Sequence, residues 1–446
     1  MNFIIPDDVK HILNVLSENG FEAFVVGGCV RDTLLGKVPH DWDICTNAKP
    51  DDIKICFKNF NTFDSGIKHG TISVAFNKEV YEITTYRIDG DYRDNRHPQS
   101  VTFTNDITLD LSRRDFTINA MAYNDDVGIV DPFDGQSDLA DKKIRCVRNA
   151  DERFCEDALR IIRALRFAAV YGFDIDEETA ASISANRELL NNIAVERINI
   201  EFTKLICGCS AANILDEFRD VIALFIPELK AEFEFNQNSR HHKYDLWHHT
   251  LCSLDYVEPD SVMRMTMLLH DIGKPHCMTS DEKGESHFIG HPALSAEISR
   301  KILRRMKYSN EFIDECICLI RNHDVRYSGS PKQLKRLITR IGESRTHKLF
   351  KIFRADIMAQ SDFEKQKKLE LVDLAEKDFN TIIETEQCFN LKQLKVNGND
   401  MIAIGIKDGR KIGDVLNKLL NMVIEDEIPN DRQKLLRKAE EIAFAD

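Results

Sequence analysis

The sequence predicts an α+β fold, in which a mixed α/β head is followed by an all-helical remainder. Runs rich in β-branched and aromatic residues at 21–26, 71–76 and 80–87 are typical of strands. From residue 151 onward, apolar residues recur with helical spacing, most clearly in FCEDALRIIRALRFAAV, and this pattern continues to the last residues. A composition of 43% apolar and 30% charged residues suits globular domains and excludes a disordered or fibrous protein.

Charge and cysteine usage narrow the class further. The net charge is −14, so we expect any nucleic-acid contact to come from local basic patches rather than from an overall basic surface. No apolar run approaches the ~20 residues that a membrane span requires, and the start of the chain has no secretory signal pattern. The 12 cysteines form no CxxC pair, which favours reduced thiols in a cytoplasmic protein.

The first candidate site begins at a glycine turn. Gly27-Gly28 ends the strand predicted at 21–26, and we expect a helix over Val30–Leu35 directly after it. Such a turn points backbone N–H groups at an anion, most often a phosphate, and Arg31 in the first helical turn can add a charge-assisted contact. The alternative is a tight turn with no ligand.

A pair of carboxylates follows at Asp41 and Asp43, leading into the short strand DICT. Residues i and i+2 of a strand face the same side, so the two carboxylates can converge on one Mg²⁺ ion. Glu82, on the strand predicted at 80–87, is the candidate third carboxylate; otherwise it is an exposed strand residue. An Asp pair alone is also common in turns. A phosphate-binding turn beside a paired-carboxylate metal site is, however, typical of nucleotidyl transfer.

The order of these motifs resembles a known family. VGGCVRDTLLG, HDWDICTNAKP, EITTYRIDGDY, RRDFTINAMAY, DPFDG and RFCEDALRIIRALRFA together resemble the bacterial-type (class II) CCA-adding tRNA nucleotidyltransferases. That family shares a superfamily with bacterial poly(A) polymerases and DNA polymerase β, and the match runs from about residue 20 to 205. The resemblance implies a polymerase-β-like head with two-metal chemistry and a helical neck that holds the incoming base. It also implies that Arg114 contacts the triphosphate, whereas the residues alone equally allow a helix cap.

The neck sequence indicates how a base is selected. Asp157 and Arg160 are i and i+3 in EDALRIIRALRF, so we expect them to share a helix face. A carboxylate only accepts hydrogen bonds and a guanidinium only donates them, which complements the amino group and ring nitrogen of cytosine and adenine but not uracil or guanine. The family pattern adds Arg163 and Arg166 as nucleotide-site residues; their alternative is intrahelical salt bridges.

A second group of chemically active residues lies in the helical remainder, and six of its members are expected to bind metal: His249, His270, Asp271, His291, His323 and Asp356. Imidazole and carboxylate ligands together suit Mn²⁺, Ni²⁺, Fe²⁺ or Zn²⁺ better than Mg²⁺ alone. The pattern resembles the HD-domain phosphohydrolases, in which His291 and His323 would extend the site to a second metal. The alternative is an inherited fold with an idle site.

These observations combine into one expectation. Residues 1–140 form the head, 141–235 the neck, 236–365 the HD domain, and 366–446 a C-terminal helical region that contacts tRNA. The expected activity is addition of C, C and A to the 3′ end of tRNA from CTP and ATP, with phosphohydrolase activity in the HD domain. The resemblance also implies that an enzyme with the full polar segment 89–99 adds A as well as C, because family members restricted to CC have a shorter one. Alternatives are a poly(A) polymerase, a CC-only or A-only enzyme, and an HD phosphohydrolase with an inactive head.

Overall fold

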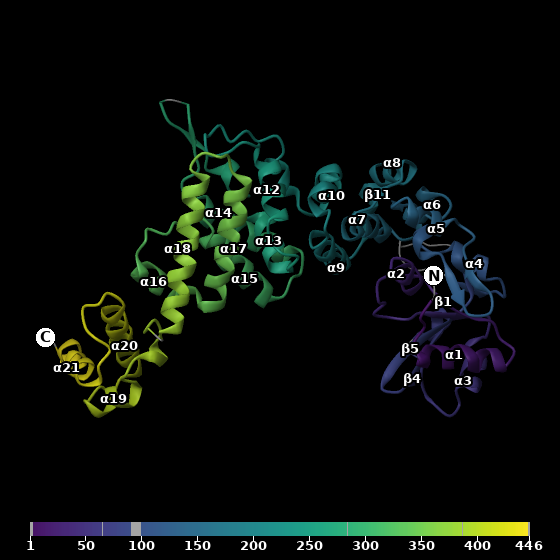
Figure 1. The fold of residues 1–446 in the computed structure, drawn as a ribbon, viewed down its shortest axis with the longest axis horizontal. Helices are drawn as coiled ribbons and strands as arrows, with labels where there is room; N and C mark the ends of the chain where they lie inside the picture. The colour runs from purple at the N-terminus through teal and green to yellow at the C-terminus, as the bar shows by residue number, and fades with distance from the viewer. Residues whose placement is uncertain (1–2, 65, 91–99, 283, 386, 445–446) are drawn as a thin grey trace. The chain divides into compact units, whose positions relative to one another are not determined.

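The computed structural model describes residues 3–64, 66–90, 100–282, 284–385 and 387–444. It separates into two compact units, Met1–Pro227 and Glu228–Asp446. Each unit has its own architecture and carries one of the two candidate sites (Figure 1). Residues 91–99 of the polar segment on which the expectation about adding A rests lie outside the described residues.

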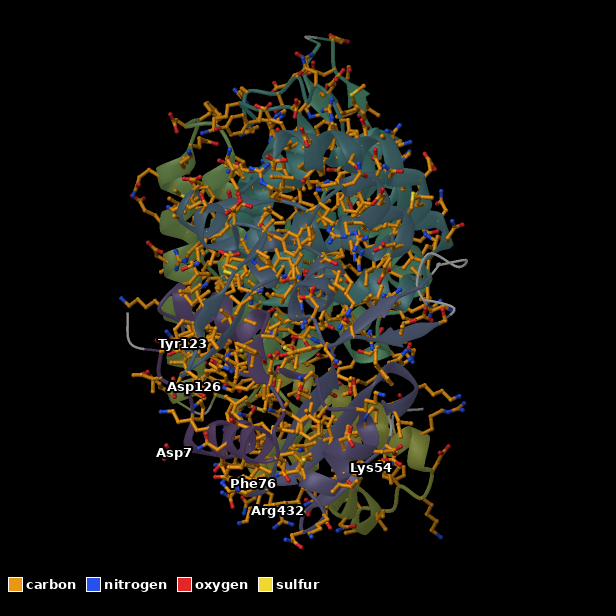
Figure 2. The ribbon with its side chains drawn as sticks, turned by 90° about the vertical axis from the view of Figure 1, so that its right-hand side faces the viewer. Asp7, Lys54, Phe76, Tyr123, Asp126 and Arg432 are labelled. Carbon is orange, nitrogen blue, oxygen red and sulfur yellow. The ribbon has the colours of Figure 1, made fainter. Side chains whose placement is uncertain are left out.

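The head at the start of the first unit is built on a seven-stranded sheet in the order β3-β4-β5-β2-β1-β8-β9. β1 is antiparallel to β2 and β8, whereas β2 is parallel to β5. Figure 2 labels Phe76 and Tyr123, which lie on β4 and β8 toward opposite edges of this sheet. The strands are β1 Ala23–Val26, β2 Ile44–Thr46, β3 Asn61–Phe63, β4 Thr71–Phe76, β5 Glu79–Thr85, β8 Ala122–Asn124 and β9 Gly128–Val130.

The predictions of a strand in each of the runs 21–26, 71–76 and 80–87 are confirmed, although the last of these strands ends at Thr85. A separate short strand pair, β6 Arg87–Asp89 and β7 Val101–Phe103, follows β5. Short helices surround the sheet: α1 Asp7–Glu18, α2 Gly28–Leu34, α3 Pro50–Cys56, α4 Ile107–Ser112 and α5 Gly135–Ala140. Buried apolar residues from β1, β2 and β8 pack with Leu111 of α4 in one core cluster of the head.

The neck completes the first unit and differs from the prediction in one important place. FCEDALRIIRALRFAAV does not form one helix: α6 ends at Glu156, Asp157 adopts an extended conformation (φ −136°, ψ 100°), and α7 begins at Leu159. The Asp157 carboxylate accepts a hydrogen bond from the Leu159 backbone N–H, the arrangement that favours Asp at a helix start. The other neck helices are α8 Glu177–Asn186, α9 Val195–Ile206, α10 Ala211–Glu217 and α11 Arg219–Phe225.

The second unit is mostly helical. Among the described residues, its first seven α-helices are α12 Leu246–Asp255, α13 Ser261–Leu269, α14 His291–Arg305, α15 Asn310–Asn322, α16 Pro331–Ile341, α17 Glu343–Ala359 and α18 Lys365–Glu384. α17 and α18 lie side by side (Figure 1). The expectation that no strand follows residue 151 is wrong: β11 Asp174–Ile175 pairs with β10 Lys143–Ile144 in the neck, and Thr279–Ser280 pairs with Ser286–His287 in the second unit. These pairs are only two residues long, too short to interrupt the helical periodicity.

The last part of the second unit has a core of its own. Three helices follow α18: α19 Gly398–Ala403, α20 Gly409–Ile424 and α21 Arg432–Phe444. Val396, Met401, Leu419 and Leu435 are all buried in one cluster formed by this segment. No helix among the described residues is long and apolar enough to cross a membrane.

Candidate functional site

The glycine turn predicted to bind phosphate is present at the start of α2. Gly27 has φ +80° and ψ −123°, a conformation that L-residues with a Cβ rarely adopt. A Cβ at Gly27 would also stand 2.8 Å from Arg114 Nη1. The turn therefore needs glycine both for its backbone conformation and for the space that the Arg114 guanidinium occupies.

Asp41 and Asp43 lie on the extended segment that leads into β2, directly before the strand begins. The backbone N–H of Val26, one residue before the turn, donates to the Asp43 carbonyl at 3.0 Å, which fixes the carboxylates beside the turn. The pKa of Asp43 is raised because protein atoms restrict hydration of its carboxyl group; the Arg114 charge opposes this shift and the Asp41 charge adds to it. Asp41, Asp43 and Arg114 therefore interact electrostatically beside the glycine turn.

Glu82 occupies the matching position on the neighbouring strand. In the parallel pairing of β2 with β5, Ile44 lies opposite Ile83, so the residues directly before them, Asp43 and Glu82, are also aligned. Matching positions on adjacent strands direct their side chains to the same face of a sheet. The three predicted carboxylates thus come from two adjacent chain segments on one side of the head.

The two predicted base-reading residues do not share a helix, because the helix is broken at Asp157. Asp157 pairs instead with Arg197 of α9, whose Nη2 is 2.9 Å from Asp157 Oδ2. Arg160 Nη2 donates to the backbone carbonyl of Arg113 at 2.9 Å, and its Nη1 pairs with Glu156. Arg160 thereby reaches the segment that carries Arg114. The premise of one shared helix face is wrong, and the sequence analysis did not identify Arg197 as the partner of Asp157.

Arg163 and Arg166 hold the neck to the head and to α9. Arg163 Nη2 lies 2.6 Å from Asp115 Oδ2. Arg166 Nε lies 2.8 Å from Glu201 Oε2, and its guanidinium stacks 3.9 Å from the centre of the Phe167 ring. Burial opposes ionisation of Asp115, but Arg163 outweighs it and holds the pKa of Asp115 below its usual range. Both arginines make ion pairs with other segments rather than within α7.

Arg31 also links the head to the neck. It is only 7% exposed, its Nε donates to Asp32 Oδ1 at 2.9 Å, and its guanidinium lies 4.8 Å from the centre of the Tyr171 ring. Its Nη2 is 3.6 Å from the point where a Gly28 Cβ would stand. Arg31 thus lies beside the glycine turn, while much of its hydrogen-bonding capacity is already used by protein groups. Its contact with phosphate stays a prediction.

The predicted histidine and aspartate cluster is brought together in the second unit. His249 is on α12, His270 and Asp271 directly follow α13, His291 begins α14, His323 follows α15, and Asp356 is on α17. Two groups have ligand atoms within 4.8 Å of one another: one comprises His249, His270, Asp271 and Asp356, and the other comprises Asp271, His291 and His323. Five helices that are far apart in the sequence, or the residues directly after them, therefore contribute side chains to one cluster.

The four imidazoles share one orientation. Nδ1 of His270, His291 and His323 lies 2.7–2.8 Å from a backbone carbonyl, and Nδ1 of His249 lies 3.5 Å from the Ala359 carbonyl. A proton on Nδ1 leaves each Nε2 as a lone-pair donor. The two oxygens of Asp271 face different pairs: Oδ2 lies 3.4 Å and 3.1 Å from Nε2 of His249 and His270, and Oδ1 lies 3.2 Å and 3.4 Å from Nε2 of His291 and His323.

The buried polar atoms of this cluster fit a cation. Nε2 of His249 and His270 and Oδ1 of Asp271 are buried without a hydrogen-bond partner among the described residues. Burial disfavours the His270 cation, but Asp271 and Asp356 outweigh it and raise the pKa of His270 to about 10. The cluster therefore attracts positive charge strongly, and a divalent ion would satisfy groups that side chains leave unpaired.

Lys274 belongs to this cluster and was missed by the sequence analysis. It is 4% exposed, and its Nζ lies 2.6 Å from Asp271 Oδ2. The signal that could have found it is its position three residues after Asp271, directly following the apolar helix. Lys274 and His270 together outweigh the effect of burial and hold the pKa of Asp271 well below its usual range.

Comparison with known proteins shows the family of the chain. Residues 23–145 match the poly(A) polymerase head domain, and residues 279–439 match tRNA nucleotidyltransferase domain 2. The chain is 33% identical to the CCA-adding enzyme of Ligilactobacillus salivarius and 34% identical to that of Limosilactobacillus fermentum, over 98% of both chains in each case. The solved Bacillus stearothermophilus CCA-adding enzyme in complex with CTP superimposes with a TM-score of 0.72 at 27% identity, covering 98% of each chain.

Proposed function

This chain belongs to the family of CCA-adding enzymes, and from that premise we propose how its first unit performs nucleotide addition. It is a nucleotidyltransferase that adds C, C and A to the 3′ end of tRNA, using CTP and ATP and releasing pyrophosphate. The observation that carries the mechanism is the meeting of Asp41, Asp43 and Arg114 at the glycine turn. We also propose the cytoplasm as its location, since the 12 cysteines are scattered along the sequence without a CxxC pair.

The carboxylates hold the metal. Asp41, Asp43 and Glu82 present oxygens on one side of the head, and the mutual repulsion of Asp41 and Asp43 favours a bound cation between them. Hard oxygen ligands and a phosphate substrate suit Mg²⁺. When bound, Mg²⁺ polarises the α-phosphate and activates the attacking 3′-hydroxyl. Arg114, which touches the turn at Gly27, supplies a positive charge for the remaining phosphates.

Asp157 and Arg160 select the base. If both side chains face the base, the Asp157 carboxylate accepts from the amino group and the Arg160 guanidinium donates to the ring nitrogen that cytosine and adenine share, whereas uracil and guanine would leave like groups facing each other. A mismatch of this kind costs about 1–3 kcal/mol for each buried polar group. Arg160 is held at the Arg113 carbonyl and Asp157 at Arg197, so both side chains are oriented before a nucleotide arrives.

The activity is tested with tRNA that lacks its 3′ end and with each labelled NTP separately. We expect incorporation of C, then A, and then no further addition, and we expect Asp41→Ala to abolish it. A long A tail would instead indicate a poly(A) polymerase, and an arrest after CC would indicate a CC-only enzyme.

A second function is favoured by the histidine cluster. We propose that His249, His270, Asp271 and Asp356 hold a divalent transition metal (Mn²⁺, Ni²⁺, Fe²⁺ or Zn²⁺) and that His291 and His323 hold a second one through the other oxygen of Asp271. The observation that carries this proposal is the set of four imidazoles whose Nδ1 atoms face backbone carbonyls while their Nε2 atoms converge on the buried carboxylates of Asp271 and Asp356. A metal at such a site supplies a hydroxide nucleophile for phosphoester hydrolysis.

The second function is tested by metal analysis of the purified protein and by phosphatase assays with and without added Mn²⁺, Ni²⁺ or Zn²⁺. We expect His270→Ala and Asp271→Ala to lose both the metal and the phosphatase activity while CTP addition continues. We expect Asp41→Ala to show the opposite pattern. Loss of both activities from any one of these changes would refute two independent sites.

A further inference from the structure

A polar chain runs from α18 to the back of the metal-binding cluster. Asp356 Oδ1 faces the cluster, 3.0 Å from His249 Nε2 and 3.8 Å from His270 Nε2. Asp356 Oδ2 accepts a hydrogen bond of 2.8 Å from Nε2 of Gln360. Lys368 Nζ donates to Gln360 Oε1 at 2.6 Å and lies 3.3 Å from His241 Nδ1. Each Asp356 oxygen therefore has a separate partner.

The donors and acceptors of these groups fix the direction of each hydrogen bond from Lys368 through Gln360 to Asp356. A lysine ammonium donates hydrogen bonds and accepts none, so the Gln360 amide must turn its oxygen toward Lys368. Its NH₂ group then faces Asp356, where it can only donate. Gln360 thus occupies Oδ2 and leaves Oδ1 directed at the histidine nitrogens. The Asp356 carboxylate only accepts hydrogen bonds, so it favours the same orientation of the amide. Without Lys368 the NH₂ group still faces Asp356, but the Gln360 side chain loses the partner that holds its oxygen in place.

We propose that Gln360 and Lys368 are positioning residues of the second site, which fix the orientation of the Asp356 carboxylate so that one oxygen faces the histidines while Gln360 binds the other. This inference rests on the proposed metal centre. Groups that orient a ligand from behind typically change metal affinity 10- to 100-fold when they are removed. Gln360, in direct contact with Asp356, has the larger role, and Lys368 acts through Gln360.

Lys368 and Gln360 also line a pocket that a substrate could enter. A pocket of about 250 Å³ is lined by His323, Asp356, Gln360 and Lys368 together with an apolar wall that includes Tyr327 and Phe353. An anionic group that enters this pocket meets the same ammonium that orients Gln360. The volume falls below the ~300–1,000 Å³ typical of drug-sized ligands, and the mixed lining suits the organic part of a small phosphate ester.

The inference is tested by isothermal titration of the metal-free full-length protein with Mn²⁺. We expect Gln360→Met, which keeps the side-chain volume, to weaken Mn²⁺ binding 10- to 100-fold. We expect Lys368→Met to weaken it about 3- to 10-fold, and Lys368→Arg to restore it, because a guanidinium also only donates. Lys367→Met is the matched control: Lys367 lines the same pocket but is 73% exposed and pairs with Glu364.

Two measurements separate the possible outcomes. Thermal unfolding in EDTA compares the metal-free variants, and we expect midpoints within about 2 °C of the wild type, which is roughly the effect of 1 kcal/mol or less in a unit of this size. A much larger fall would assign the loss to folding and overturn the positioning role. Wild-type affinity in Gln360→Met would overturn this inference alone. A wild-type protein that binds no Mn²⁺ would refute the metal centre itself.

Discussion

Replacing Gly27 by alanine adds one carbon atom, the Cβ, and tests whether the glycine turn needs the space that Arg114 occupies. Gly27 has φ +80°, and its added Cβ would stand 2.8 Å from Arg114 Nη1. A non-glycine residue in the left-handed region costs about 1–2 kcal/mol. Gly20→Ala is a matched control, because Gly20 has φ +83° but no heavy atom within 4 Å of the Cβ position. Both variants should therefore lose similar stability, about 2–4 °C in Tm for each kcal/mol.

The two variants should differ in activity instead. The tip of the Arg114 side chain can move away from a new methyl group at little cost to folding, but it then leaves the position from which it acts on Asp43 and, in the proposed mechanism, on the triphosphate. Losing a hydrogen bond to a charged group costs about 1.5–3 kcal/mol, which corresponds to a fall of roughly 10- to 100-fold in kcat/KM for CTP addition. Gly20→Ala should keep the wild-type kcat/KM. Wild-type kcat/KM in Gly27→Ala, or an equal loss in both variants, would refute the reasoning.

Three further outcomes are expected. Arg197→Met should release the Asp157 carboxylate and raise UTP incorporation relative to CTP by about tenfold, because losing the hydrogen bonds that hold Asp157 costs about 1–3 kcal/mol. An unchanged ratio of the two kcat/KM values would contradict this. Asp115→Asn should destabilise the first unit at pH 7 in urea unfolding: Arg163 holds the folded pKa of Asp115 below its unfolded value, so the stabilisation is present above pH ~4 and is lost as pH falls. The two proteins should then converge in stability toward pH 2, and a constant difference would argue against the ion pair. EDTA should stop both activities, and Mg²⁺ alone should restore CTP addition without the transition-metal phosphatase; full recovery of both would argue against different metals.

The sequence analysis predicted both sites because their chemistry is concentrated in short motifs. Asp41 and Asp43 lie two residues apart, and the histidines of the cluster lie in or next to four consecutive helices, α12 to α15. The strands at 71–76 and 80–87 were equally predictable, since both runs are rich in β-branched and aromatic residues, which favour strands.

What the sequence could not predict depends on single side chains acting at a distance. The break at Asp157 was missed because the apolar residues on either side keep helical spacing across it, while one carboxylate caps the next helix. Arg197 is separated from Asp157 by 40 positions, and Gln360 and Lys368 are ordinary polar residues on helix surfaces. Their roles follow from hydrogen bonds that periodicity does not encode.

The segment Arg113–Asp115 serves two neighbours at once. Its middle residue, Arg114, faces the glycine turn, while the carbonyl of Arg113 binds Arg160 and the carboxylate of Asp115 binds Arg163. A chimera that joins the neck of a relative to this head should therefore also take the three residues at positions 113–115 from that relative. If only the neck is exchanged, Arg113–Asp115 would face arginines of the relative in place of Arg160 and Arg163. The exchange would then disturb the head, although Asp41, Asp43 and Glu82 are unchanged.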